Sequence, residues 1–356
     1  MPPTQTLAHQ WGVDHIAIQK AMGQLVKEGL INRKQRRGTF VNDKKTEQAM
    51  LAILVAHNLM DEPKYFSRSL IKWISEEIQT TTEYTCRIYD KMDDLIALSD
   101  FKQDPLYRNL TNDLRNYHFK GIIQLVGGIA VLKNRIPELN IPTASLGPNK
   151  GETNDVMVDL HSFGYDCGKF IAQQGRKKAV YLRGYLREKS SSWEELPDTG
   201  GFLKASRDFG LQNVEIHQMA PPEKGVPYLE QSAYENTLVL IDQWQRSNQW
   251  PDALLLSDDI AARGITLALA QKNVDVPNRV LVVAMANEGI VHPYGIPVVR
   301  YEFSPRLVAK NMLEILQKRM CGGEVKDLPV KIAGNLREYT PIETSAANTG
   351  NRIADN

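Results

Sequence analysis

Four basic side chains lie within five residues near the start of the chain: Arg33, Lys34, Arg36 and Arg37. No acid lies among them, and guanidinium and ammonium groups of this kind bind phosphate. The whole 356-residue chain has a formal net charge of only +1, so a nucleic-acid surface must come from local clustering. Taken alone, such a charged segment is more often a solvated surface, and the elements around it decide between the two.

A second group of side chains has the chemistry that binds sugars. Sugar sites pair carboxylates and amides with hydroxyl groups and stack an aromatic ring on the apolar sugar face. Phe66 is also a candidate for core packing, Asp259 for a helix cap, and His292 for a merely solvated loop histidine. The candidate ligand residues are Asn58, Tyr65, Phe66, Asp159, His161, Trp193, Asp198, Asp259, Asn287 and Tyr301.

Two short helices precede the basic cluster. The first is predicted over Thr4–Gln10, after two prolines, and Gly12 makes the tight turn that follows. Asp14 can cap the second helix, which runs toward Leu30. The apolar stripe of this helix has the spacing i, i+4, i+7 and i+8 and consists of Ile18, Met22, Leu25 and Val26. His15, Ala17, Gln19 and Lys20 lie off that stripe.

A hairpin completes this N-terminal module. Gly29 ends the second helix, and residues 30–34 and 39–41 are predicted strands around the turn at 35–38. A helix-turn-helix followed by a basic hairpin is the winged-helix plan. Its second helix enters the major groove, and its hairpin places arginines against phosphate or the minor groove. With the two helices in front, the basic cluster indicates DNA binding.

The module resembles the winged-helix domain of the GntR family of bacterial repressors. The resemblance is carried by Leu7-Ala8, Gly12-Val13, Lys20-Ala21, Leu25, Glu28-Gly29-Leu30-Ile31 and Gly38-Thr39-Phe40-Val41. It implies DNA contacts from Gln5, His15, Ala17, Gln19, Lys20, Arg36, Arg37 and Gly38.

Two departures separate the module from that family. The family has arginine where this chain has Gln5 and Gln19. Because glutamine pairs with adenine but adds no charge, we expect a weaker or different sequence preference. The family also has a helix before Pro2. We therefore expect a winged helix that lacks its first helix and, at about 40 residues, buries little core.

Strands and helices alternate through the rest of the chain. The alternation predicts an α/β fold of doubly wound parallel sheets, and roughly 290 residues exceed one comfortable core, so we expect two lobes. In such folds ligands bind beyond the C-terminal ends of the strands. The predicted strands are 50–56, 84–89, 121–126, 141–146, 179–182, 214–218, 253–256, 280–285 and 298–301.

This body resembles the LacI/GalR-type regulator core, which shares its fold with type I periplasmic sugar-binding proteins. The carriers are Lys64-Tyr65-Phe66, Phe119-Lys120-Gly121-Ile122-Ile123, Asn140-Ile141-Pro142, Gly175-Arg176-Lys177-Lys178-Ala179-Val180, Gly201-Phe202, Pro251-Asp252-Ala253, residues 257–264, Val276-Pro277 and residues 282–285. A GntR-type head on a LacI-type body resembles the arabinose-repressor subgroup.

This chain has Asp198 where the family often has arginine, and Ala286-Asn287 where it often has two acids. These departures predict an unusual effector or a different binding mode.

Several classes of protein are disfavoured by what the sequence lacks. Cys86, Cys167 and Cys321 are far apart, which disfavours a zinc site or a disulfide framework and suits a reducing compartment. Apolar runs stay below the about 20 residues of a membrane helix, and the N-terminus has no signal-peptide core. We therefore expect a cytoplasmic protein. The phosphate-loop, nucleophile-elbow and metal-pair motifs of enzymes are absent, so we expect no enzymatic activity, no cofactor and no metal.

Together these features predict a homodimeric DNA-binding repressor that responds to a sugar or a sugar-like effector held between two lobes. Residues 1–41 are the expected DNA-binding domain, 42–48 a linker, 49–343 the effector-binding and dimerisation domain, and 344–356 a disordered tail. The partners would be double-stranded operator DNA and the effector, with no membrane. The alternative is a small-molecule sensor without operator binding, which rests on the missing first helix and the two absent arginines.

Overall fold

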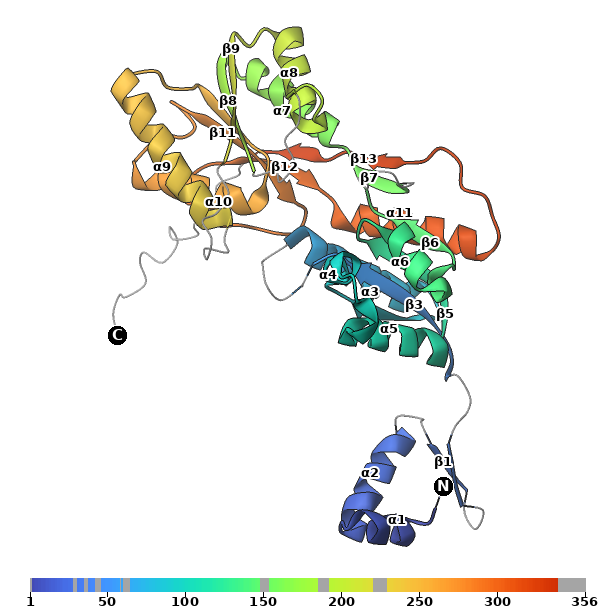
Figure 1. Cartoon of the computed structure of the whole chain (residues 1–356). Helices are drawn as coiled ribbons and strands as arrows, with labels where there is room; N and C mark the ends of the chain where they lie inside the picture. Colours follow the sequence, from blue (N-terminus) through green and yellow to red (C-terminus); the bar gives the residue numbers. More distant parts are fainter. Residues whose placement is uncertain are drawn as a thin grey trace, which may run out of the picture.

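The structure of the chain is a computed structural model. It describes residues 2–27, 31–34, 38–41, 46–57, 59, 65–147, 154–184, 192–219 and 229–338. These residues form a small N-terminal head and a larger α/β body (Figure 1). The predicted tail 344–356 and residues 42–45 of the predicted linker 42–48 lie outside the described residues, whereas residues 46–48 belong to the first strand of the body and not to a linker.

The head contains two helices and one hairpin. Helix α1 covers Thr4–Trp11 and helix α2 covers His15–Lys27. Gly12 has a φ of 62°, so its left-handed conformation makes the turn between the helices, and its N–H donates to the carbonyl of Ala8. The hairpin pairs β1 (Ile31–Lys34) with β2 (Gly38–Val41) in antiparallel register. The helix-turn-helix and the hairpin are therefore built as the sequence predicts.

Local chemistry accounts for the start and the buried face of α2. The Asp14 carboxylate accepts a hydrogen bond from the Ile16 N–H at 3.2 Å, which caps the helix. The core of the head consists of Leu7, Ile18, Met22 and Ile31, with Ala8 and Leu25 packed against it. Val26 is 40% exposed, so its place in the predicted apolar stripe is wrong. At eight residues beyond Ile18 the helix has turned 80° past two full turns, which carries Val26 off the core.

The first lobe of the body is a four-stranded parallel sheet in the order β4-β3-β5-β6. Helices α3 (Tyr65–Thr81) and α11 (Pro305–Met320) pack together on one face, on alternate side chains of β3. Helices α4 (Met92–Ala97), α5 (Pro105–Asn116) and α6 (Ile129–Arg135) cover the other face. The strands are β3 (Thr46–Val55), β4 (Thr85–Tyr89), β5 (Tyr117–Leu125) and β6 (Thr143–Ser145), with short 3-10 helices at Phe101–Gln103 and Pro137–Leu139.

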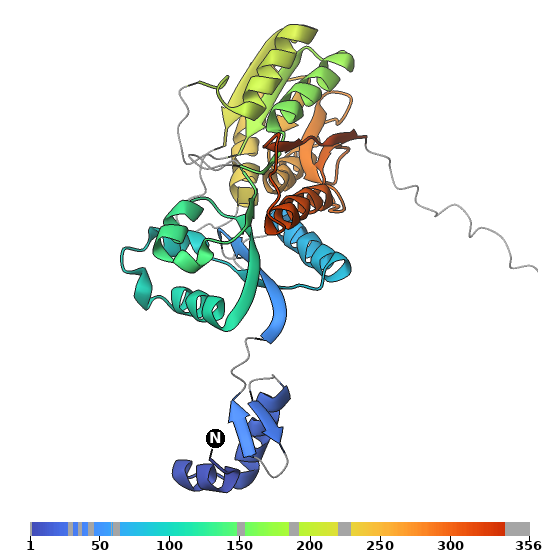
Figure 2. The same cartoon turned by 90° about the vertical axis from the view of Figure 1, so that its right-hand side faces the viewer.

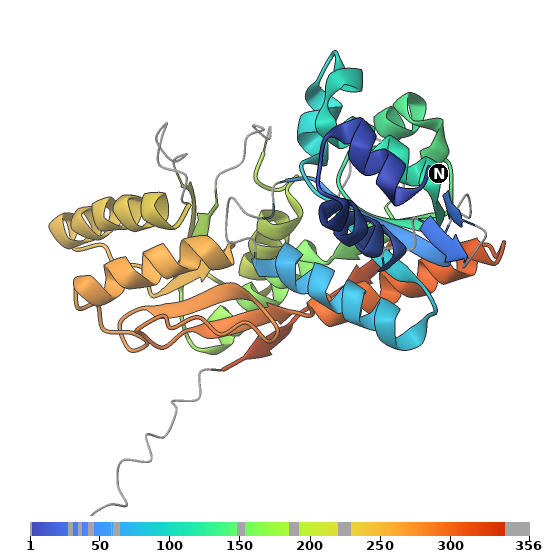
Figure 3. The ribbon, with the colours of Figure 1, turned by 90° about the horizontal axis from the view of Figure 1, so that it is seen from below.

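The second lobe is a six-stranded sheet in the order β14-β12-β11-β10-β8-β9. Only β14 (Asn335–Arg337) runs antiparallel to its neighbour. Helices α9 (Leu229–Ser247) and α10 (Asp259–Gln271) lie side by side on one face (Figure 3), and α7 (Leu160–Gln173) and α8 (Pro197–Phe209) cover the other. The remaining strands are β8 (Lys178–Arg183), β9 (Asn213–Gln218), β10 (Ala253–Leu256), β11 (Leu281–Asn287) and β12 (Val299–Phe303).

The chain crosses between the lobes three times (Figure 2). Strand β7 (Val156–Val158) leads from β6 to α7, the end of β12 leads to α11, and β13 (Val330–Ile332) leads back to β14. Strands β7 and β13 pair with each other in parallel. The doubly wound, two-lobed α/β fold predicted from the sequence is confirmed. The three-residue strands β7, β13 and β14 were not predicted, because so short a segment has no readable period.

Two further findings concern the described part of the chain. None of its helices has both the length and the apolar character needed to cross a membrane. No three or more of its histidine, cysteine, aspartate and glutamate side chains come together in an arrangement that would hold a metal ion.

Candidate functional site

A polar cluster lies where the strand ends of the second lobe face the first helix of the first lobe. Strand β11 ends at Asn287, and α10 begins at Asp259 just after β10. The Asn287 side-chain amide donates to the Asp259 carboxylate at 2.6 Å. The His292 Nε2 lies 4.0 Å from the same carboxylate oxygen. Two predicted ligand residues are therefore in direct contact at the edge of the sheet where α/β folds bind ligands.

The same cluster contacts the first lobe through Tyr65, the first residue of α3. Arg263 on α10 donates from Nη1 to the Tyr65 hydroxyl at 2.7 Å. The rings of Tyr65 and His292 meet edge to face, with centroids 4.7 Å apart. Phe66 packs against hydrophobic cores of both lobes. Tyr65 and Phe66 are thus at the junction of the lobes, where the sequence expects a ligand to bind.

A glycine sets the position of Arg263. A Cβ on Gly264 would lie 2.0 Å from the carbonyl oxygen of Glu230, so α9 and α10 approach each other closely at this point. The close approach brings the Glu230 carboxylate to 3.4 Å from the Arg263 guanidinium. Both side chains are about one-third exposed, at 34% and 32%. Arg263 therefore reaches a carboxylate of its own lobe and a phenol of the other lobe.

Two polar atoms beside this cluster are buried and unsatisfied. Among the described residues, neither His292 Nε2 nor Tyr294 Oη has a hydrogen-bond partner. Burial, together with the nearby Asp259 carboxylate, raises the pKa of the Tyr294 phenol to about 12. Both atoms therefore keep unused hydrogen-bonding capacity, and burial keeps Tyr294 as the neutral phenol.

The sequence predicts either ligand binding or helix capping for Asp259, and the structure excludes the helix cap. Asp258, not Asp259, caps α10, because its carboxylate accepts from the N–H groups of Ile260 and Ala261 at 2.9 and 2.8 Å. The Asp259 side chain is left to Asn287 and His292.

The prediction that Asp198 binds ligand is corrected by the structure. Asp198 is 3% exposed. Its carboxylate accepts two hydrogen bonds from Arg183, at 2.9 and 3.1 Å, and one from the Tyr181 hydroxyl at 2.8 Å. Burial and this carboxylate raise the pKa of Tyr181 far above its usual range. Asp198 therefore neutralises a buried arginine.

Tyr301 is also corrected, because its side chain is 1% exposed and lies in the core. Its hydroxyl donates to Asp166 at 3.3 Å and accepts from the Gly334 N–H at 3.2 Å. Strand β12 alternates buried and half-buried positions, and Tyr301 occupies a buried one. No part of this side chain is free to contact an effector.

Asp159 and His161 belong to the first turn of α7. The Asp159 carboxylate accepts from the N–H and hydroxyl of Ser162 at 3.0 and 2.8 Å, so it caps the helix. Burial opposes ionisation of Asp159, but these two hydrogen bonds outweigh it and lower the pKa of the carboxyl. His161 is exposed and stacks on Tyr165, with ring centroids 6.4 Å apart. In the described structure neither residue contacts the cluster.

Trp193 is half-buried just before α8, and its carbonyl accepts a hydrogen bond from the Thr199 hydroxyl. Nothing in the described structure joins its ring to the cluster. Asn58 lies outside the described residues.

The predicted DNA-contacting side chains form an exposed surface on the head. Gln5, Ala17, Gln19 and Lys20 are all exposed. His15 is half-buried, with Nε2 3.3 Å from the Thr4 hydroxyl. Gly38 is exposed at the start of β2 with a φ of 104°, a conformation that favours glycine. Arg36 and Arg37 lie outside the described residues.

Three members of the cluster were not predicted: Glu230, Arg263 and Tyr294. For His292 the sequence favours a solvated loop histidine, but its side chain is 7% exposed and lies beside Asp259. Arg263 follows Asp259 by four residues, one helical turn, so it lies on the same face of α10. That spacing is a signal from which Arg263 can be found. Glu230 and Tyr294 carry no such signal, because their neighbours come from other parts of the chain.

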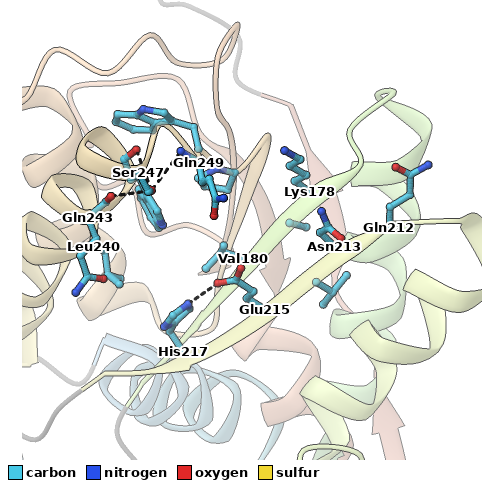
Figure 4. Close-up of a pocket in the computed structure, with 15 residues that line it drawn as sticks. Lys178, Val180, Gln212, Asn213, Glu215, His217, Leu240, Gln243, Ser247 and Gln249 are labelled. Carbon is cyan, nitrogen blue, oxygen red and sulfur yellow. Dashed lines mark hydrogen bonds and ion pairs between the residues drawn. The ribbon is translucent and has the colours of Figure 1, made fainter.

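A hollow lies on the second lobe, away from the polar cluster (Figure 4). It has a volume of about 570 Å³ and is lined by the start of β8, by β9 and by the second half of α9. Within it, His217 Nε2 lies 3.0 Å from the Glu215 carboxylate. Lys178, on its wall, is the first residue of β8. The candidate effector cluster is instead at the C-terminal ends of the parallel strands, where ligands of α/β sheets bind.

Comparisons with known proteins find matches to two parts of the chain. Residues 1–41 match the family model "Bacterial regulatory proteins, gntR family", and residues 169–338 match "Periplasmic binding protein-like domain". Residues 1–41 are therefore similar to GntR-type helix-turn-helix domains, and residues 169–338 to periplasmic-binding-protein-like domains.

Three similar proteins illustrate the two parts. The HTH-type transcriptional repressor PurR of Vibrio atlanticus is 21% identical over 174 residues, 49% of this chain and 48% of the relative. The HTH-type transcriptional repressor NagR of Bacillus subtilis is 40% identical over 50 residues, 14% of this chain and 21% of that protein. The matches thus span about half of PurR and a fifth of NagR. A solved complex of the transcriptional regulator CelR with cellobiose has the same fold, with a TM-score of 0.58, 15% identity and coverage of 95% of this chain and 98% of the other.

Proposed function

We propose that this chain, with a GntR-type head in front of a LacI-type body, is a DNA-binding transcriptional repressor whose effector is a sugar or a sugar-like molecule. Residues 1–41 would bind operator DNA, 42–48 would link, and 49–343 would bind the effector and dimerise. We place it in the arabinose-repressor subgroup, and as a DNA-binding regulator it would act in the cytoplasm. The named relatives are transcriptional repressors, and CelR is solved with a sugar.

One observation carries the effector part of this proposal. Arg263 of α10 donates a hydrogen bond to Tyr65 of the first lobe, directly beside Asp259, His292 and Tyr294. A molecule bound there would contact both lobes at once. Its binding energy would therefore depend on how far the lobes are closed, which is the condition for a ligand to shift a conformational equilibrium.

The head supports the DNA part of the proposal. The exposed front of α2 presents an amide at Gln19 and an ammonium at Lys20, the two kinds of group that read a base edge and bind a phosphate. Helix-turn-helix dimers bind two half-sites whose spacing mirrors the spacing of the heads. Movement of the lobes in a homodimer would alter that spacing and hence the operator affinity, so effector and DNA would be reciprocally coupled.

The test is fluorescence anisotropy of the full chain with a duplex from its own upstream intergenic region and a scrambled duplex, at one fixed salt concentration. Specific binding is expected. Lys20→Ala should weaken binding to both duplexes and reduce the salt slope by about 1. Gln19→Ala should reduce discrimination between the duplexes by roughly 1–3 kcal/mol.

The control is Lys72→Ala, which removes an exposed lysine from α3 in the body and should leave both affinities unchanged. Equal binding of the wild-type chain to the two duplexes would contradict operator recognition. The chain would then be a small-molecule sensor without operator binding, which is the alternative function.

A further inference from the structure

We propose that the polar cluster around Tyr65, Asp259 and Arg263 selects a neutral polyhydroxy effector over a phosphorylated or carboxylated one, and that Arg263, held by Glu230, is the specificity-determining residue. This inference rests on the proposed function and specifies the chemistry of its effector. It is carried by the charges and hydrogen bonds around Tyr65, Asp259 and Arg263.

The guanidinium of Arg263 is already balanced on its own lobe. Its Nη2 lies 3.4 Å from the Glu230 carboxylate, and its Nη1 donates to the neutral phenol of Tyr65 at 2.7 Å. The phenol oxygen has the same hydrogen-bonding capacity as the hydroxyl of a sugar. A ligand hydroxyl can therefore take the place of Tyr65 on Nη1 without disturbing the ion pair.

An anion would meet an unfavourable environment at the same position. A phosphate on Arg263 would approach the carboxylates of Glu230 and Asp259, and like charges repel each other. Arg183, another cation at a strand end, donates two hydrogen bonds to Asp198 and is 9% exposed. Among the described residues, the two arginines are thus each matched by an acid of the same lobe.

Hydrogen-bond chemistry points the same way. The Asp259 carboxylate only accepts hydrogen bonds, and it receives one from Asn287. In the described structure no lysine or arginine lies within 4.0 Å of it. The Asp259 carboxylate therefore favours a ligand group that donates a hydrogen bond. A hydroxyl group donates one, and a phosphate dianion does not. A sugar with several hydroxyls could also satisfy His292 Nε2 and Tyr294 Oη, which are buried without a partner among the described residues.

The same two helices carry a matched control pair. Lys272 of α10 lies 2.9 Å from Asp242 of α9, as Arg263 of α10 lies 3.4 Å from Glu230 of α9. In the described structure the Lys272 pair makes no contact with the first lobe. Asp242→Asn therefore removes an acid from α9 and breaks a bond to α10 without touching the polar cluster.

The experiment is calorimetric titration of the full chain with matched probes: glucose and glucose 6-phosphate, fructose and fructose 1-phosphate, and N-acetylglucosamine and its 6-phosphate. For any pair that binds, the neutral sugar is expected to have a Kd about tenfold lower than the phosphorylated one. Glu230→Gln should free the guanidinium and reduce that ratio about tenfold, toward equal affinity. Arg263→Met should weaken the neutral sugar about tenfold, and Asp242→Asn should leave the ratio unchanged.

Tighter binding of the phosphorylated probe by the wild-type chain would overturn the inference while leaving a sugar effector intact. An equal shift of the affinity ratio in Glu230→Gln and Asp242→Asn would also overturn the inference. The shift would then come from removing any negative charge from α9, and not from freeing Arg263. If none of the six probes binds the folded chain, the sugar effector of the proposed function fails, and this inference fails with it.

Discussion

At the scale of single residues, the buried pair of Asp198 and Arg183 shows that the role of a charged side chain depends on its surroundings. The side chains of Asp198 and Arg183 are 4% and 10% exposed. Arg183 donates two hydrogen bonds to the Asp198 carboxylate, and Tyr181 donates a third. Glycines at 164 and 201 allow this arrangement, since a Cβ on Gly164 would lie 1.9 Å from the Asp198 carbonyl oxygen. Asp198 thus stabilises the second lobe instead of facing the effector.

We expect Asp198→Ala to destabilise the second lobe by about 3–5 kcal/mol, because it leaves a buried guanidinium without its partner. Urea unfolding of the full chain followed by circular dichroism would measure this. The control is Asp208→Ala on the same helix, which breaks an exposed pair with Lys204 and should change stability little. Equal effects of the two substitutions would contradict the structural role of Asp198.

At the scale of elements, two helical glycines are expected to respond in opposite directions. Gly264 of α10 faces the backbone of Glu230 at the crossing with α9, whereas a Cβ on Gly23 of α2 would meet nothing within 4 Å. Glycine is costly in a helix unless a close approach requires it. The crossing requires it at 264, and nothing in the described structure requires it at 23.

Gly264→Ala should therefore destabilise the body by roughly 1–3 kcal/mol through forced separation of α9 and α10. Gly23→Ala should instead stabilise the head by about 0.5–1 kcal/mol through helix propensity. Differential scanning calorimetry of the full-length variants would compare their transitions with that of the wild-type chain. A loss of stability in Gly23→Ala would mean that an unseen neighbour packs on that position.

At the scale of the whole molecule, the relative position of the lobes depends on a few contacts between residues distant in sequence. Tyr65 and Arg263 are separated by 198 residues, yet they form a hydrogen bond between the lobes. The three chain crossings, with β7 paired to β13, permit movement while limiting its direction.

We expect Tyr65→Phe to shift the lobes toward more open arrangements, because it removes a hydrogen bond worth about 1 kcal/mol. Spin labels on exposed Cys321 of the first lobe and on Val239→Cys of the second, in a Cys86→Ser background, would report the distance by electron paramagnetic resonance. Cys167 is fully buried, and burial raises the pKa of its thiol, so it stays unlabelled. The control is Tyr234→Phe, which removes a hydroxyl bonded to Gln271 within the second lobe. Identical label-to-label distances in the wild-type chain, Tyr65→Phe and Tyr234→Phe would refute the cross-lobe role of Tyr65.

The sequence by itself determined the features that depend on near neighbours. Gly12 and Asp14 define the turn and cap of the head through local backbone chemistry, and apolar runs such as 253–256 mark central strands because both of their faces are covered. The alternation of strands and helices then leads to two α/β lobes, since each sheet needs helices on both faces.

Only the tertiary structure decided how distant side chains pair. The partner of Asp198 is Arg183 and that of Arg263 is Tyr65, and β7 finds β13 more than 170 residues away. A carboxylate in the sequence is equally a candidate ligand group, a helix cap or the partner of a buried arginine. In the structure Asp259 accepts from Asn287, Asp159 caps a helix and Asp198 pairs with Arg183. The choice among these depends on which groups the fold brings within 3 Å, and chain spacing does not encode that distance.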